Sequence, residues 1–327
     1  MSDMPPKARL LRLPHEGVRS LVWDGDTLAD WVGGIRRFDL KGGYEPPRVG
    51  YPYLFDAAVA DGDDAVIYTR FGTKGLVLRA GSVLRELNRS FYYADAYDYP
   101  ITVFRLDSGR KVIGHCPEDC NRLEIEDLET GERLTAKSSR QSAALFHSRL
   151  SVSPNGRYLM SAGWLWHPLD QINIYDIAEG LKSPEHLDGP GVRTGTWADK
   201  VSACWTHDKR LIFGISQDED EEDETPAPKL RFYDVAEGLT RTLALEEQVG
   251  QIMPVGEDYL LNLYDHPKLI DLRTGAVVQA WPDIPCGRRT SSICIPKPDF
   301  MPTLAFDPQM RRCAIATEQE IFVLMFD

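Results

Sequence analysis

Residues 172–181 read Ile-Asn-Ile-Tyr-Asp-Ile-Ala-Glu-Gly-Leu, and residues 230–239 read Leu-Arg-Phe-Tyr-Asp-Val-Ala-Glu-Gly-Leu. Two copies of one phrase in a single chain indicate a structural unit that is used more than once. Each copy is an apolar run that ends at Asp and continues into a Gly-containing turn. This pattern predicts a strand, a tight turn and a return strand. Weaker copies of the pattern occur at residues 35–40, 123–131, 269–275 and 321–327.

A second repeated feature precedes most of these copies. It consists of an apolar run, a polar turn and another apolar run. Its turns contain Asp-Gly, Ser-Gly, Asn-Gly or Asp-Pro, residues that tolerate positive φ or preset a turn, so each segment predicts a β-hairpin. The segments are residues 20–33, 57–70, 103–116, 150–163, 203–217, 252–265 and 304–317. Seven hairpins, each followed by a third strand, predict an all-β protein that is a seven-bladed β-propeller of four-stranded antiparallel blades.

The repeats assign all 327 residues to one propeller domain. The expected blades span about residues 16–50, 51–90, 91–138, 139–188, 189–246, 247–285 and 286–327. The last strand, 321–326, has no strand after it, whereas the apolar segment Ala8–Leu13 precedes the first hairpin. We therefore expect Ala8–Leu13 to be the outer strand of the last blade and to close the ring, the alternative being a loose arm.

The segment Ser153–Leu159 (Ser-Pro-Asn-Gly-Arg-Tyr-Leu), followed by an apolar strand that ends at Tyr175-Asp176, resembles the repeats of WD40 and WD40-like (YVTN-type) propellers. The resemblance covers nearly the whole chain as a pattern. The Trp-Asp dipeptide of that family is replaced here by Tyr-Asp, Phe-Asp, Glu-Asp or Ile-Asp, and no Gly-His dipeptide opens the blades. The resemblance therefore implies a divergent propeller, without the His–Asp hydrogen-bond network of strict WD40 repeats.

Charge and composition limit the classes of partner and compartment. The net charge is −13, with 37 basic and 50 acidic residues, which argues against nucleic acid or an anionic membrane as the main partner. Seven of the acids form one run at residues 218–224, which we interpret as a solvated loop of the fifth blade. No run of 18 apolar residues and no apolar leader segment is present. The six cysteines form no disulfide framework, so we expect them to be reduced and the protein to be cytoplasmic.

The candidate binding residues lie in loops that a propeller gathers at one end of its channel. These loops join one blade to the next or the second strand of a blade to the third, and they are rich in aromatic side chains. Aromatic residues and Arg offer large contact areas at low entropic cost, as binding surfaces require. The candidates are Tyr92, Tyr93, Tyr97, Trp164, Trp166, His167, Arg193 and Trp197. The alternative is that such residues fill the channel or pack between blades.

Catalytic motifs are missing from the sequence. It contains no Gly-x-Ser-x-Gly, His-Glu-x-x-His, phosphate-binding Gly-rich loop or dinucleotide fingerprint, and Cys116-x-x-x-Cys120 lacks the second half of a zinc site. We therefore predict a non-catalytic protein–protein interaction module, a scaffold or a specific inhibitor. No cofactor and no metal ion are predicted, and the partner is expected to be a protein with a basic surface. The alternative is a propeller hydrolase or lactonase with a metal in the channel.

Overall fold

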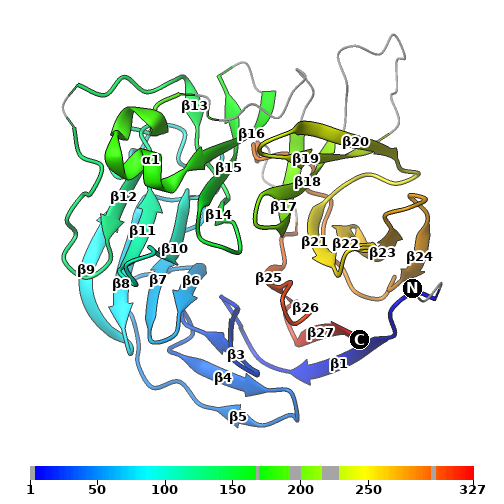
Figure 1. Cartoon of the computed structure of the whole chain (residues 1–327). Coiled ribbons are helices and arrows are strands. Elements are labelled where there is room, and N and C mark those ends of the chain that lie inside the picture. The colour runs from blue at the N-terminus through cyan, green and yellow to red at the C-terminus, as the bar shows by residue number, and fades with distance from the viewer. Residues whose placement is uncertain are drawn as a thin grey trace.

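The structure is a computed structural model that describes residues 4–137, 139–166, 169–189, 191, 200–215, 228–295 and 300–327. Seven antiparallel sheets stand around a central channel, which confirms the predicted seven-bladed β-propeller (Figure 1). Within a sheet the strands follow chain order from the channel outward, except that β13 and β14 share the inner position of blade 4 and β1 is the outermost strand of blade 7. The turns between first and second strands share one end of the ring, called here the hairpin face. The blade-linking segments share the opposite end, called here the linker face.

Five blades have the expected four strands. Blade 1 contains β2 (Val22–Asp24), β3 (Thr27–Asp30), β4 (Arg36–Asp39) and β5 (Tyr44–Glu45). Blade 2 contains β6 (Ala57–Asp61), β7 (Asp64–Tyr68), β8 (Lys74–Arg79) and β9 (Ser82–Asn88). Blade 5 contains β17 (Lys200–His207), β18 (Arg210–Ile215), β19 (Lys229–Asp234) and β20 (Gly238–Ala244). Blade 6 contains β21 (Gln251–Val255), β22 (Tyr259–Tyr264), β23 (His266–Asp271) and β24 (Val277–Ala280). Blade 7 contains β25 (Thr303–Asp307), β26 (Arg312–Ala316), β27 (Glu320–Phe326) and β1 (Ala8–Pro14).

Blades 3 and 4 depart from the regular pattern. The sheet of blade 3 has three strands among the described residues, β10 (Ile101–Arg105), β11 (Lys111–His115) and β12 (Glu124–Asp127). In blade 4 the inner position is shared by β13 (Leu145–Phe146) and β14 (Leu150–Val152), both paired with β15 (Tyr158–Leu165), which pairs with β16 (Leu169–Asp176). The chain then forms the short helix α1 (Ile177–Lys182) and the 3-10 turn η1 (Pro184–Leu187) where an outer strand was expected. No helix in the described ranges has the length and apolar character needed to cross a membrane.

The N-terminal strand closes the ring, as predicted. Strand β1 pairs antiparallel with β27 over seven residue pairs, from Ala8 with Phe326 to Pro14 with Glu320. Its side chains contribute to two separate cores: Leu10 packs against the cluster between blades 6 and 7, and Leu13 belongs to the cluster between blades 7 and 1.

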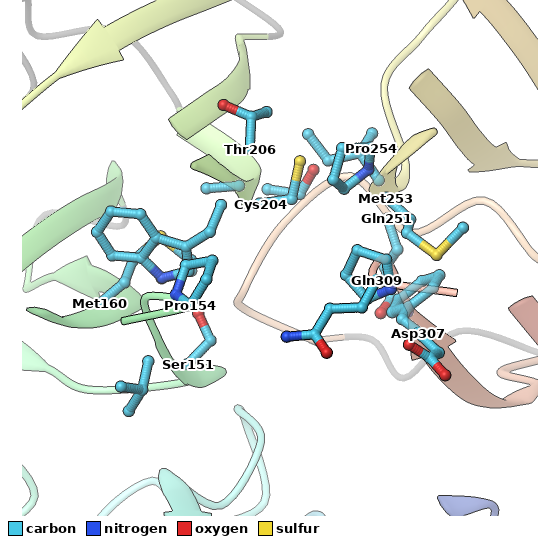
Figure 2. Close-up of a pocket in the computed structure, with 18 of the residues that line it drawn as sticks. Ser151, Pro154, Met160, Cys204, Thr206, Gln251, Met253, Pro254, Asp307 and Gln309 are labelled. Carbon is cyan, nitrogen blue, oxygen red and sulfur yellow. The ribbon is translucent and has the colours of Figure 1, made fainter. Parts of the chain in front are cut away.

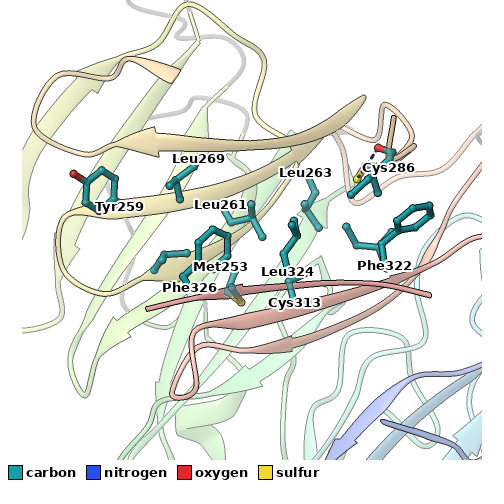
Figure 3. Close-up of a cluster of buried hydrophobic side chains, with 13 residues drawn as sticks. Met253, Tyr259, Leu261, Leu263, Leu269, Cys286, Cys313, Phe322, Leu324 and Phe326 are labelled. Atoms are coloured by element: carbon teal, nitrogen blue, oxygen red, sulfur yellow. Dashed lines mark hydrogen bonds between the residues drawn. The ribbon is translucent and has the colours of Figure 1, made fainter. Parts of the chain in front are cut away.

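The blades are held together by apolar clusters between neighbouring sheets. Figure 3 shows the cluster between blades 6 and 7, where Leu261 and Leu269 of blade 6 face Leu324 and Phe322 of blade 7. Because each such cluster is shared by two blades, removing one blade's apolar side chains destabilises its neighbour as well. Cys286 and Cys313 lie in this cluster and, like the other four cysteines, are free.

The Asp of the repeated phrase has the same role in both copies. Asp176 accepts hydrogen bonds from two backbone N–H groups of the following turn and pairs with Arg157 at 3.1 Å. Asp234 accepts from the N–H of Ala236 and lies 3.4 Å from the Nε of Arg210. In both cases a carboxylate at the end of the third strand satisfies the turn and contacts an arginine beside the second strand. The repetition therefore has a structural cause.

Candidate binding surface

The segment that links blade 6 to blade 7 reaches across the linker face to blades 3 and 4. We call residues 286–295 the linker strap. The backbone N–H of Cys294 donates to the carbonyl of Ala96 at 2.6 Å, and Ile293 forms a β-bridge with Tyr97. The N–H of Ser292 donates to Asp170 at 2.8 Å, and the Ser292 hydroxyl donates to the carbonyl of Gly163 at 3.1 Å. The strap thus joins parts of the ring that are distant in sequence.

A buried arginine organises the loop between β9 and β10. The guanidinium of Arg89 donates to the backbone carbonyls of Gly72, Ala94, Tyr97 and Asp98. It also lies 4.6 Å from the ring centre of Tyr97 and 4.9 Å from that of Tyr99. Burial lowers the pKa of Arg89, because the charged form loses solvent, and four carbonyl acceptors offset that loss. Arg89 therefore fixes the backbone from which Tyr92 and Tyr93 project.

An aromatic cluster lies on the linker face over blades 3 and 4. Its buried layer consists of Tyr97, Phe146 and Trp164, with Phe146 and Trp164 stacked at 4.0 Å between ring centres and 7° between ring planes. Its outer layer consists of Tyr92 and Trp166, stacked at 5.9 Å and 16°, together with Tyr93, whose ring stands edge-on to Trp166 at 5.4 Å.

The outer layer is partly exposed although it is packed from below. Tyr92 is 50% exposed, Tyr93 41% and Trp166 44%. We call these three side chains the aromatic platform. Phe91, beside it in sequence, and Ile295 at the end of the strap are more exposed still. Contiguous exposed aromatic side chains of this kind are typical of interaction surfaces.

The structure brings together five of the eight candidate binding residues, but not all at the surface. Tyr92, Tyr93 and Trp166 form the platform, whereas Tyr97 and Trp164 are 0% and 4% exposed and lie beneath it. The expectation that these last two side chains are exposed on loops is therefore corrected. Tyr97 pairs with the strap and Trp164 belongs to β15, so both are covered. His167, Arg193 and Trp197 lie outside the described residues, as does the acidic run 218–224.

Sequence reasoning missed Phe146, Arg89 and the strap. Phe146 lies in a short apolar run before the fourth hairpin, which gives no sign that it stacks on Trp164. Arg89 follows a strand that is exposed along much of its length, and only the folded loop shows its carbonyl partners. The strap contacts depend on a linker that crosses the ring, which no local pattern could have indicated.

The central channel contains a cavity of about 690 Å³. It is lined by the inner strands of blades 4 to 7 and by their hairpin turns, and Figure 2 shows these side chains around a common opening. A smaller cavity of about 200 Å³ shares Arg149, Gln251 and Phe306 with the first and lies toward the linker face. Among the described residues, no group of three or more His, Cys, Asp or Glu side chains is arranged to hold a metal ion.

Comparison with known proteins supports the fold. No protein-family model and no curated protein sequence matches the chain. Among solved structures, the β-propeller domain of Cps50 (Swd1) from Myceliophteria thermophila is similar, with a TM-score of 0.59, 10% identity, and coverage of 98% of this chain and 99% of that one. BamB from Moraxella catarrhalis has a TM-score of 0.51 and 13% identity, with 95% and 84% of the two chains covered. The computationally designed Ika8 protein has a TM-score of 0.51 and 13% identity, with 95% and 97% covered.

These similarities concern the fold alone, since the identities are so low. They confirm a WD40-like propeller at the level of architecture, without a family match in sequence.

Proposed function

We propose that this chain is a non-catalytic protein-interaction module that binds a partner protein through the aromatic platform. The observation that carries the proposal is the stacking of half-exposed Tyr92 and Trp166 on a buried layer of Phe146 and Trp164. Side chains held in this way lose little conformational freedom on binding. Rigid aromatic anchors of this kind contribute most to affinity in protein interfaces.

Three sets of contacts hold the aromatic platform and the layer beneath it rigid. Arg89 holds the loop that carries Tyr92 through three of its carbonyls and ties that loop to the carbonyl of Gly72 in blade 2. Strand pairing between β15 and β16 holds the base of Trp166. The linker strap supports the buried layer through the bridge between Tyr97 and Ile293. A partner therefore meets a surface that is already ordered, which reduces the cost of association.

Charge favours a partner with basic groups around an apolar anchor. The chain carries a net charge of −13, and the exposed Asp95 lies in the same loop as the platform. Complementary charges around an apolar contact increase the association rate and favour one partner over others. Both a scaffold subunit and an inhibitor of a basic enzyme or toxin would meet this description.

The test first identifies the partner and then measures its affinity for the chain. A photo-crosslinking amino acid at Phe91, which is exposed beside the platform, captures the partner in an extract of the source organism, and mass spectrometry identifies it. The affinity of the purified partner is then measured for Tyr92→Ala and Trp166→Ala. Loss of a central aromatic anchor costs about 2 kcal/mol, so we expect affinity to fall about thirtyfold for each variant.

Tyr44→Ala is the matched control. Tyr44 is an aromatic residue exposed to a similar degree, but it lies on β5 at the outer edge of blade 1. Its replacement should leave the affinity unchanged, and all three variants should keep the melting temperature of the parent chain within a few degrees. The proposal fails if Trp166→Ala and Tyr92→Ala bind the purified partner as tightly as the parent does, or if Tyr44→Ala weakens binding equally.

A further inference from the structure

The wide cavity of the central channel has a mainly apolar wall. It opens toward the hairpin face, because Pro154, Gly256 and Gln309 of the hairpin turns line it. In Figure 2 the Gln309 side chain extends into the opening. The volume of about 690 Å³ lies within the range of small-molecule sites, about 300–1,000 Å³. The apolar wall includes Val152, Met160, Ala203, Trp205, Met253 and Phe306.

The wall is formed before any ligand arrives, because its side chains belong to the clusters between blades. Met160 and Trp205 lie in the cluster between blades 4 and 5, and Met253 lies in the cluster between blades 6 and 7. Phe306 of blade 7 packs against the second of these clusters. A ligand therefore meets side chains that are already held in place, so little free energy is lost in ordering them.

Two charged side chains of the wall already interact with neighbours of opposite charge. Arg149 interacts with Asp98 and Asp170, and Asp307 forms an ion pair with Arg312 at 2.9 Å. A charged ligand would lose its hydration in this apolar space, whereas an uncharged ligand avoids that cost. The wall therefore favours an uncharged ligand. The other charged residues of the described lining are exposed in the hairpin turns and are Glu257 and Arg311.

A neutral polar side chain lies at the junction of the two channel cavities. Gln251 lines both the wide and the smaller cavity, and it is half-buried. In the described part of the chain its carboxamide has no hydrogen-bond partner. A carboxamide carries two N–H donors and one oxygen acceptor, so it can bind the carbonyl oxygen of a neutral molecule.

We propose that the central channel binds an uncharged apolar molecule, whose carbonyl oxygen accepts a hydrogen bond from Gln251 and whose apolar body occupies the wide cavity. Burial against the apolar wall supplies most of the affinity, and the hydrogen bond from Gln251 fixes the orientation of the ligand. The residues that line the cavity include none of the three side chains of the aromatic platform, so the test of this site does not depend on the proposed function.

Benzophenone and diphenylmethane are matched probes for the full chain, because both carry the same two rings and only benzophenone carries a carbonyl group. Benzophenone also reports its own position. Under ultraviolet light its carbonyl oxygen takes a hydrogen from a nearby C–H group, and its carbonyl carbon then bonds to that carbon. We expect labelling that saturates below about 0.5 mM and that mass spectrometry locates at cavity residues such as Met160 and Met253. The affinity of diphenylmethane is measured by its competition with this labelling.

Substitution of Gln251 tests the hydrogen bond. Gln251→Leu should weaken benzophenone about fivefold without weakening diphenylmethane, because only the contact with the carbonyl oxygen is lost. Gln279→Leu, the same change on the outer strand β24 of blade 6, should alter neither affinity. Trp166→Ala changes the aromatic platform and should leave labelling of the channel unchanged. Circular dichroism checks that each variant is folded.

Three results would overturn the proposal. The first is labelling that does not saturate below about 0.5 mM. The second is labelling confined to residues outside the cavity, the aromatic platform included. The third is a folded Gln251→Leu variant that binds benzophenone as the parent does, or that weakens both probes equally.

Discussion

Removing the N-terminal strand should destabilise the propeller severely, although that strand is at the start of the chain. Deleting residues 1–14 removes seven residue pairs from the sheet of blade 7. It also removes Leu13, which is 5% exposed, and the partly buried Leu10 and Leu11. Burying a Leu side chain fully contributes about 1.5–3 kcal/mol. With one Leu fully buried and two partly buried, we expect a loss of about 3–6 kcal/mol.

This loss is a large share of the free energy of unfolding, which is about 5–15 kcal/mol for an ordinary domain. The deletion also exposes the edge of β27 (Glu320–Phe326), in which residues 321–326, Ile-Phe-Val-Leu-Met-Phe, are all apolar. An exposed apolar edge pairs with other chains, so size-exclusion chromatography should show association.

Urea unfolding followed by circular dichroism measures the stability. The control deletes residues 1–6, which precede β1, and should retain the parent's stability. A point variant separates packing from pairing: Leu13→Ala keeps the strand and should cost about 2–5 kcal/mol, whereas Leu54→Ala, at an exposed position, should cost little. If the chain lacking residues 1–14 has the same unfolding midpoint as the parent and remains monomeric, the closure argument is refuted.

Two further predictions concern buried polar groups. Arg89→Met keeps the apolar stem but leaves buried carbonyls without their donor, so it should lower stability by at least about 3 kcal/mol and loosen the platform; an unchanged melting temperature, with Arg48→Met as the control, would argue against that role. His147 is buried against Ser161, and burial lowers its pKa from 6.5 to about 4. Between pH 6.5 and 4 the unfolded chain therefore binds a proton at His147 and the folded chain does not. The free energy of unfolding is highest above pH 6.5, and about 3 kcal/mol of it is lost as the pH falls toward 4. His147→Gln should flatten the unfolding free energy between these pH values, and an identical pH profile in that variant would contradict the assignment.

Most of the architecture could be predicted from local pattern, because its determinants are local. Each of the seven predicted hairpins corresponds to the first two strands of a blade, and Ala8–Leu13 lies within β1. Alternation of apolar residues and turn chemistry act over a few residues, so they can be read directly from the chain. The predicted contact residues Tyr92, Tyr93 and Trp166 also do come together, since a propeller collects its linking loops at one end.

The burial of Tyr97 and Trp164 could not be predicted in this way. Both lie in segments that look like exposed loops, and they are covered because the linker strap and Phe146 arrive from elsewhere in the chain. The arginines around the smaller channel cavity could not be predicted from local pattern either. Arg70, Arg149 and Arg289 are far apart in sequence, and only the closed ring places them around Asp98.

The repeated phrase itself shows where local sequence stops deciding structure. After Tyr-Asp, both copies continue with a β-branched residue and then Ala-Glu-Gly-Leu. After Asp234 the phrase forms a tight turn with Gly238 at a φ of 84°, and β20 follows. After Asp176 it forms helix α1, with Gly180 inside the helix and covered by Leu187. The residues beyond the phrase differ: Thr240 and Thr242 favour a strand, whereas Pro184 cannot extend one and starts the turn η1. The six residues that both copies share, Tyr, Asp, Ala, Glu, Gly and Leu, set the end of a strand and the contacts of its Asp. The residues after them, and the surface against which those residues pack, select between helix and strand, because neither element is stable without the surface that it buries.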